Sequence, residues 1–144
     1  MEPKSMGKVI VQARIENLED LFKVHQGALN ANQVRTVEVN DALVDAGATG
    51  LMMPKRLVSQ LGLMPVRTRT ARTVNGLATL NIYAAAQLTI QERDCRVDVY
   101  EIPDELPVLI GQIPLEALDW IVDPVNQRLI GNPEHGGQHM IDAF

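Results

Sequence analysis

The chain has 144 residues, with 13 lysines and arginines against 18 aspartates and glutamates, which gives a formal net charge of −5 at pH 7. This length suits one domain, and a hydrophobic content of 46% excludes a wholly disordered chain. The negative charge argues against a general nucleic-acid binder, because such proteins need an excess of cations to replace counterions. We expect one domain over 1–144, with its core over about 8–131 and a polar tail over 132–144.

The cysteine content and the apolar segments indicate the compartment. The single cysteine, Cys95, excludes an internal disulfide and any metal site built from several cysteines. The N-terminal sequence leads into no apolar stretch typical of a secretory signal. No apolar run approaches the ~20 residues of a membrane span. We therefore expect a cytoplasmic protein without a membrane partner.

The first third of the chain reads as extended segments around one loop. Residues 8–15 alternate apolar and polar side chains, which predicts a strand. Residues 17–21 follow without an assignment, and the polar segment after them, up to Gln33, is expected to be a loop. Residues 35–45 hold two β segments joined by Asn40-Asp41. This pattern predicts a tight hairpin whose second strand ends at Asp45.

The middle of the chain combines a short helix with the longest predicted strands. A helix is expected over 54–61, opened by a proline and stopped by a glycine. Residues 67–74 alternate arginine and threonine and favour a strand. Asn75-Gly76 predicts a hairpin turn, because both positions tolerate positive φ. Residues 79–90 place apolar side chains at every even position, which is typical of a half-buried antiparallel strand.

The last third adds the remaining strands. Residues 95–99 are expected to pair with the long strand, and the apolar run 108–110 ends at Gly111. A short helix follows over 114–118, and a final hairpin over 120–130. Seven to nine short strands with two short helices predict an all-β protein that closes into a barrel or a sandwich. Nothing alternates strand, helix and strand, which argues against a Rossmann-type enzyme.

Asp45 is the first candidate for chemistry. It ends an apolar segment and is followed by Ala46, Gly47 and Ala48. A carboxylate at such a place is costly unless it is hydrogen-bonded or paired, and small neighbours let backbone amides or a second chain approach it. The triplet by itself favours a simple turn, since Asp-x-Gly is a common turn sequence. The sequence around the triplet is therefore needed to distinguish a simple turn from a catalytic site.

The wider sequence resembles the retropepsin-like aspartic proteases, the single-lobe family of retroviral proteases and their cellular relatives. Their active-site signature has two or three apolar residues, Asp, Thr or Ser, Gly and Ala, and residues 42–49 here read Ala-Leu-Val-Asp-Ala-Gly-Ala-Thr. The turn at 75–76 lies about where this family has its flap. Residues 108–111, Val-Leu-Ile-Gly, are similar to its second signature, which passes beside the catalytic strand. The matches cover roughly 8–131, and the small bacterial clan AA members look especially similar.

The resemblance implies a homodimeric aspartic endopeptidase with an acid-protease fold, a polypeptide substrate and neither a metal nor an organic cofactor. One carboxylate from each subunit would share a proton with its partner and activate a water. Apolar surface near the flap, including Val74, Leu77 and Ile110, would favour apolar side chains beside the scissile bond. The implied site residues are Asp45 as the catalytic residue, Ala46, Gly47, Ala48 and Thr49 as the active-site loop, Val74, Asn75, Gly76 and Leu77 as the flap, and Leu109, Ile110 and Gly111 as the second signature loop.

Ala46 departs from the family pattern, which has Thr or Ser after the aspartate. In the family that hydroxyl donates a hydrogen bond across the dimer axis, and a buried hydrogen bond is worth on the order of 1 kcal/mol. Two symmetric bonds would be lost here. The alternative function is therefore a retropepsin fold kept as a peptide-binding or dimerisation module with little or no catalysis.

Other polar groups have simpler interpretations. The three arginines of 67–74 are an anion site or, as we favour, a solvated strand face. The spacing of Glu134, His135 and His139 suits a metal only on a helix, and Gly136-Gly137 disfavours one, so a mobile tail is expected. Two further side chains are expected in the core or at an interface, namely Cys95 and Trp120.

Overall fold

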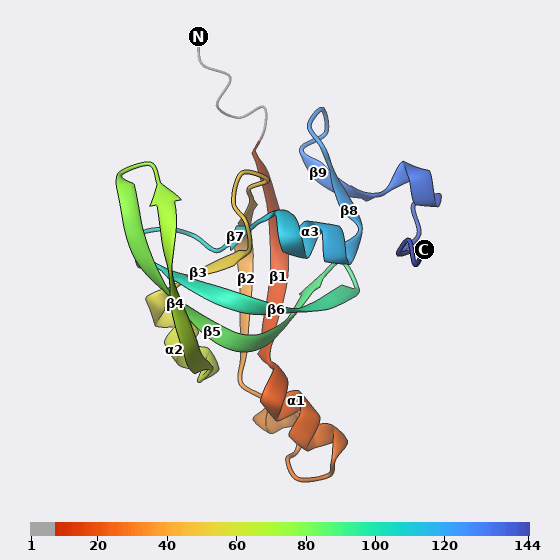
Figure 1. The fold of residues 1–144 in the computed structure, drawn as a ribbon. Coiled ribbons are helices and arrows are strands. Elements are labelled where there is room, and N and C mark those ends of the chain that lie inside the picture. Colours follow the sequence, from red (N-terminus) through yellow and green to blue (C-terminus); the bar gives the residue numbers. More distant parts are fainter. Residues whose placement is uncertain (1–7) are drawn as a thin grey trace.

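The computed structural model describes residues 8–144 (Figure 1). Its strands are β1 (Val9–Asn17), β2 (Thr36–Val44), β3 (Leu51–Pro54), β4 (Met64–Thr73), β5 (Gly76–Ile90), β6 (Arg93–Ile102), β7 (Leu109–Ile110), β8 (Trp120–Asp123) and β9 (Arg128–Gly131). Its helices are α1 (Leu18–His25), α2 (Lys55–Leu61) and α3 (Gln112–Leu118), with 3-10 turns η1 (Ala31–Gln33) and η2 (Pro133–His135). In this part of the chain no helix has the length and apolar character needed to cross a membrane.

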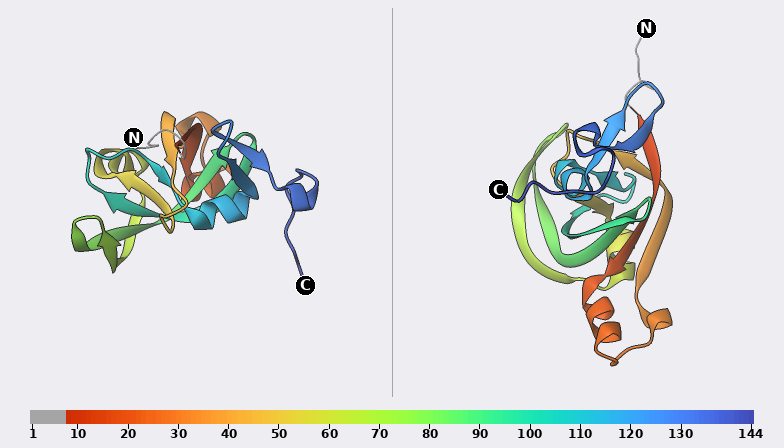
Figure 2. Two further views of the ribbon diagram at one scale, coloured as in Figure 1. Left: turned by 90° about the horizontal axis from the view of Figure 1, so that it is seen from above. Right: turned by 90° about the vertical axis from the view of Figure 1, so that its right-hand side faces the viewer.

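Six strands close into a barrel in the order β1-β2-β7-β3-β6-β5, because β5 also pairs with β1. Strands hold 49% and helices 20% of the described residues, which confirms the predicted all-β class with a closed barrel. Strand β4 pairs with β5 alone, so the β4–β5 hairpin extends beyond the barrel. Figure 2 shows this hairpin on one side of the molecule and the C-terminal segment on the other.

Strand β1 shows how the barrel forms. Its residues Val9, Val11, Ala13 and Ile15 are buried and the residues between them are more exposed, as the alternation in the sequence predicts. Buried aliphatic side chains from β2, β3, β5, β6 and β7 and from helices α2 and α3 add to the core. The interior is therefore aliphatic, in a sequence whose aromatic content is only 3%.

The loop predicted after residue 21 is wrong at its start, because helix α1 begins at Leu18 and extends to His25. Asn17 caps this helix, with its side-chain oxygen accepting the N–H of Asp20 at 3.0 Å. Glu19 lies in the first turn and Lys23 in the last, where their charges favour the helix dipole. Residues 8–144 therefore contain three α-helices, one more than predicted.

The hairpin predicted at Asn40-Asp41 is also wrong, because β2 is one continuous strand. Val11 pairs with Ala42 and Ala13 with Val39, so one residue of β1 faces both Asn40 and Asp41. These two residues form a β-bulge, which takes up an extra residue without ending a strand.

The other predicted elements are confirmed with small shifts. Helix α2 ends before Gly62, which has the left-handed φ of 61° suited to a glycine. The β4–β5 turn is confirmed one residue earlier than predicted: Thr73 pairs with Gly76, so Val74 and Asn75 form the turn, and only the glycine has a positive φ. The last hairpin is β8–β9, as predicted.

The polar tail is docked on the body, which contradicts the expected mobile tail. His135 Nδ1 lies 2.7 Å from Asp119 Oδ2, and the same oxygen accepts the Met140 N–H at 3.2 Å. Arg93 reaches from β6 and donates to the Gly137 carbonyl at 2.6 Å. The sequence of the tail alone does not reveal these partners, because they belong to distant elements.

Candidate active site

Asp45 is held at the end of β2 by its own backbone. Its N–H donates to the Ile110 carbonyl at 2.9 Å, and its carbonyl accepts the Ala48 N–H at 3.0 Å. Its carboxylate Oδ1 accepts the Gly47 N–H at 3.0 Å. The side chain is partly exposed, and among residues 8–144 it forms no ion pair. One carboxylate oxygen is thus fixed, and the other takes no hydrogen bond within the described residues.

The second signature loop lies directly beside the loop of Asp45. Strand β7 lies between β2 and β3, parallel to the first and antiparallel to the second. Three backbone hydrogen bonds then join the loops: Gly111 N–H to the Gly50 carbonyl at 2.9 Å, Gln112 N–H to Ala48 at 2.8 Å and Ile113 N–H to Thr49 at 2.9 Å. The structure therefore brings together the residues of the first and second predicted signatures.

A row of side chains runs across the sheet from the side of Asp45, four of them half-buried and the last, Ile82, buried. Leu43 pairs with Leu109, Leu109 with Met52, Met52 with Tyr100, and Tyr100 with Ile82. Paired residues point to the same face of a sheet, and these five residues lie outside the main core cluster. We call them the outer row. Asp45 follows Leu43 by two positions, so both point to this outer face.

The outer row also contacts the loop. Gly50 lies so close to the Tyr100 ring that a Cβ on the glycine would be 2.7 Å from the ring carbon Cε1. Beside this contact is a pocket of about 310 Å³, lined in part by Gly50, Tyr100, Ile113 and Pro114. A partly apolar surface therefore adjoins the loop that carries Asp45.

The residues predicted at the hairpin turn lie at the exposed tip of the β4–β5 hairpin. Val74 and Leu77 are 101% and 76% exposed, and Asn75 and Gly76 are exposed as well. In Figure 1 this tip and the loop between β2 and β3 are both at the upper end of the molecule. The expectation that Ile110 lines the groove is wrong, because this side chain is fully buried in the core.

Leu109 takes the place expected of Ile110 on the outer face. The sequence did not reveal the outer row, because residues 42–44, 51–53 and 108–110 read as continuous apolar runs. Such runs are typical of strands covered on both faces. One signal was available: the middle residue of each run has to point away from the core, because side chains alternate along a strand. Which residues lie beside it on the neighbouring strands depends on the register.

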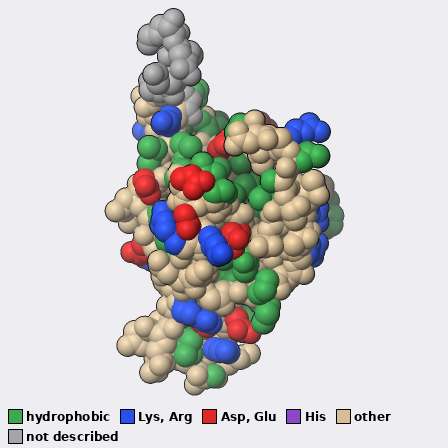
Figure 3. Space-filling view, turned by 90° about the vertical axis from the view of Figure 1, so that its left-hand side faces the viewer, with side chains coloured by type: hydrophobic (Ala, Val, Ile, Leu, Met, Phe, Trp, Pro, Cys, Tyr) green, Lys and Arg blue, Asp and Glu red, His purple; other side chains and the backbone are tan. Residues whose placement is uncertain are grey.

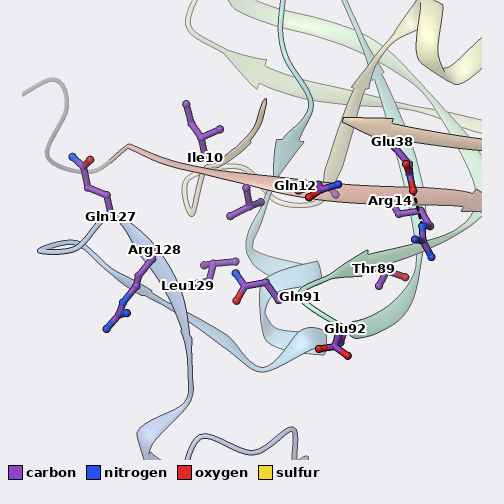
Figure 4. Close-up of a pocket in the computed structure, with 12 residues that line it drawn as sticks. Ile10, Gln12, Arg14, Glu38, Thr89, Gln91, Glu92, Gln127, Arg128 and Leu129 are labelled. Carbon is purple, nitrogen blue, oxygen red and sulfur yellow. Dashed lines mark hydrogen bonds and ion pairs between the residues drawn. The ribbon is translucent and has the colours of Figure 1, made fainter. Parts of the chain in front are cut away.

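A second pocket, of about 600 Å³, lies away from this site (Figure 4). Ile10, Gln12 and Arg14 of β1 line it together with Leu129 of β9 and Gln91 of the β5–β6 turn. Its rim carries the Arg14–Glu38 ion pair, with Nε 2.9 Å from Oε1 and both side chains 54% exposed. None of its lining residues belongs to the two signature loops or to the hairpin tip, so we place the candidate site at Asp45.

The described residues offer no group of three or more His, Cys, Asp or Glu side chains placed to hold a metal ion. His139 Nε2 instead lies 3.0 Å from the Ala117 carbonyl, and His135 is engaged by Asp119. Cys95 is partly buried against the core, as expected, and burial raises the pKa of its thiol to about 11. Trp120 also packs against the core and donates its indole N–H to the Ile90 carbonyl at 3.2 Å.

Comparison with known proteins identifies the family of the chain. No curated protein sequence matches the chain. A family model described as "gag-polyprotein putative aspartyl protease" matches residues 25–117, which include both signature loops and the whole β4–β5 hairpin. This match covers more than half of the 144 residues. The chain therefore belongs to this retropepsin-like family of gag-polyprotein aspartyl proteases.

Proposed function

We propose that the protein is a homodimeric aspartic endopeptidase in which Asp45 of each subunit supplies one of the two catalytic carboxylates. The observation that carries this proposal is the position of Asp45 on the outer face, at the end of a strand bonded to the second signature loop. The family match supports an aspartyl protease-like domain. The chain contributes one such signature, so a second subunit has to bring the other carboxylate.

The chemistry follows from two carboxylates on either side of one water. The ionised carboxylate accepts a proton from the water, whose oxygen attacks the scissile carbonyl carbon. The protonated carboxylate donates its proton to the carbonyl oxygen, which gives a tetrahedral diol. Collapse of the diol breaks the C–N bond, as the amine leaves with a proton from the dyad. In each subunit, the Gly47 N–H would orient one carboxylate oxygen and leave the other free for these transfers.

The exposed parts of the site suit a second subunit and a polypeptide. Ala46 and Gly47 are exposed in the single chain, so their backbone is available for contact across a two-fold axis. We propose that the β4–β5 hairpin acts as the flap and closes over an extended substrate. The half-buried members of the outer row would then contact the substrate side chains near the scissile bond.

Ala46 motivates a second candidate function. An alanine methyl group neither donates nor accepts a hydrogen bond. The side chain at position 46 therefore forms no hydrogen bond between the active-site loops of the two subunits across the two-fold axis. A chain with this residue would form a weaker dimer and a less rigid pair of carboxylates. The alternative is therefore a peptide-binding or dimerisation module with little catalysis.

One experiment separates the two functions. Sedimentation over a dilution series and cleavage of peptides at acidic pH would be measured for the natural chain, Ala46→Thr and Asp45→Asn. For a protease we expect Ala46→Thr to tighten the dimer and raise the rate, and Asp45→Asn to abolish cleavage with an unchanged circular dichroism spectrum. Cleavage retained in Asp45→Asn would exclude Asp45 as the catalytic residue. Peptide binding without turnover in both the natural chain and Ala46→Thr would favour the module.

A further inference from the structure

The β4–β5 hairpin carries three positive charges and no negative one. Arg67, Arg69 and Arg72 lie on β4, and β5 has no charged residue over its 15 positions. All three arginines are exposed, and none forms an ion pair within residues 8–144. The rest of the chain is acidic, since the whole has a net charge of −5. In Figure 3 this hairpin forms the right-hand edge, where basic side chains have no acidic neighbours, whereas the two kinds are mixed elsewhere on that face.

The strand register divides these arginines between two faces. Arg67 pairs with Ile82 and Arg69 with Leu80, so both point to the face of the outer row. Arg72 pairs with Leu77, three residues along the strand from Arg69. Since side chains alternate between the two faces, Arg72 points to the other face. The outer row therefore continues from Ile82 to Arg67, and it runs from the side of Asp45 to a pair of guanidinium groups.

We propose that Arg67 and Arg69 bind acidic side chains of the polypeptide substrate and so direct cleavage to apolar sites flanked by aspartate or glutamate. This inference rests on the proposed function, because it assigns the substrate class of the same site. Guanidinium groups bind carboxylates through short, charge-assisted and often bidentate hydrogen bonds. On this hairpin the two groups have no acidic partner of their own to displace.

The geometry of the sheet limits where the acidic residue lies. The outer row crosses from β2 to β4 in five strand spacings, or roughly 24 Å along the sheet at about 4.8 Å each. An extended peptide rises about 3.4 Å per residue, so it covers the path in about seven residues. The acidic residue is therefore expected within about seven positions of the scissile bond.

Charged residues on β4 also protect an exposed sheet edge from pairing with another chain. That role does not depend on the face to which an arginine points, so Arg72 would serve it as well as Arg67. Substrate selection does depend on the face. Arg72→Ser is thus a matched control that removes one charge from the same hairpin without touching the outer face.

The test uses peptides that contain one central apolar pair, with Asp or Glu placed at each position up to about seven residues on either side. Their counterparts carry Asn or Gln. At about pH 6 the acidic side chains are ionised, and we expect the full chain to cleave the best acidic peptide with kcat/KM about tenfold above its amide counterpart. The single variants Arg67→Ser and Arg69→Ser should each reduce this ratio, the double variant should abolish it, and Arg72→Ser should keep it. Thermal unfolding would verify that all variants are folded.

Equal cleavage of acidic and amide peptides would overturn the inference, and so would an equal loss of preference in Arg72→Ser. If the natural chain cleaves none of the peptides, the proposed function fails and the inference is judged by binding alone. Fluorescence anisotropy of the same labelled peptides then decides. Tighter binding of acidic peptides that weakens with salt and depends on Arg67 and Arg69 supports the inference. Equal binding of both peptide sets overturns it.

Discussion

Gly111 packs its backbone directly against the backbone of Ala48, and this contact joins the two signature loops. A Cβ at Gly111 would lie 2.5 Å from the Ala48 carbonyl oxygen and 2.6 Å from that of Gly50. Both distances are far below van der Waals contact, and both neighbours are backbone atoms that cannot rotate away. The glycine of the second signature is therefore required by the close approach of the loop that carries Asp45.

We predict that Gly111→Ala destabilises the fold by about 3 kcal/mol, because the methyl group pushes apart loops that are joined by three backbone hydrogen bonds. Any activity that depends on Asp45 should fall as well. Urea denaturation measures the stability change. Gly27→Ala is the control: its φ of 78° is strained for alanine but nothing lies within 4 Å, so about 1 kcal/mol is expected. Equal losses in the two variants would contradict the role given to the close contact.

Asp20 and Arg35 anchor α1 through an ion pair in which the carboxylate is buried and the guanidinium is partly exposed. The guanidinium Nε and Nη2 donate to the carboxylate at 2.8 and 2.9 Å, the Arg35 N–H adds a third bond at 3.0 Å, and Asp20 is 3% exposed. We predict that Asp20→Asn costs about 2 kcal/mol of the free energy of unfolding. The control Glu38→Gln breaks the exposed Arg14 pair and should cost less than about 1 kcal/mol.

The same pair predicts a pH effect that urea denaturation can check. The hydrogen bonds from Arg35 lower the pKa of Asp20, so the folded state favours the ionised carboxylate. Its contribution is present above the unfolded pKa of 3.8 and is lost as the pH falls through the lowered folded value. The difference between the natural chain and Asp20→Asn should shrink in strong acid. A difference that is constant with pH would show that the charge of Asp20 is not involved.

The contact between His135 and Asp119 predicts a limited pH range for docking of the tail. The hydrogen bond to Asp119 raises the pKa of His135, and the same bond lowers the pKa of Asp119. The histidine contribution is present below its unfolded pKa of 6.5 and is lost as the pH rises through the raised folded value. The aspartate contribution is present above 3.8 and is lost as the pH falls through the lowered value.

We therefore expect the tail to dock best between about pH 4 and pH 6.5. Limited proteolysis after residue 131 should quicken as the pH rises above that range. His135→Gln should remove this dependence while the barrel stays folded. His139→Gln is the matched control, because that ring contacts the Ala117 carbonyl rather than a carboxylate. Identical proteolysis profiles for the natural chain and His135→Gln would exclude His135 as the titrating group.

Cys95 should react slowly with alkylating reagents in the folded protein. Burial, followed by the nearby charge of Asp94, raises the pKa of its thiol from 9.0 to about 11. Because the thiolate is the reactive form, alkylation at pH 8 should be on the order of 100-fold slower than in urea-unfolded chain. Mass spectrometry of iodoacetamide-treated protein would measure both rates. Equal rates would show that the thiol is not buried in solution.

The sequence by itself determined the local features that depend on residue type. The apolar run before Asp45, the small residues after it and the Val-Leu-Ile-Gly run identified both signatures, and strict alternation identified β1 and β5. These features could be predicted because each depends on the types of residues that are adjacent in the sequence. The errors at α1 and at the bulge of β2 were also local. A single capping residue started the helix, and Asn40-Asp41 suits a bulge as well as a turn.

Only the tertiary structure decided which residues share a face. The register across six strands aligned Leu43 with Ile82 and Arg67, and it separated Arg67 and Arg69 from Arg72. The register also buried Ile110 and left Leu109 half-buried on the outer face, while docking of the C-terminal tail placed His135 against Asp119. Periodicity along one strand records burial in that strand alone. Partners across a sheet are set by loop lengths, bulges and packing of the whole barrel, so no single segment contains that information.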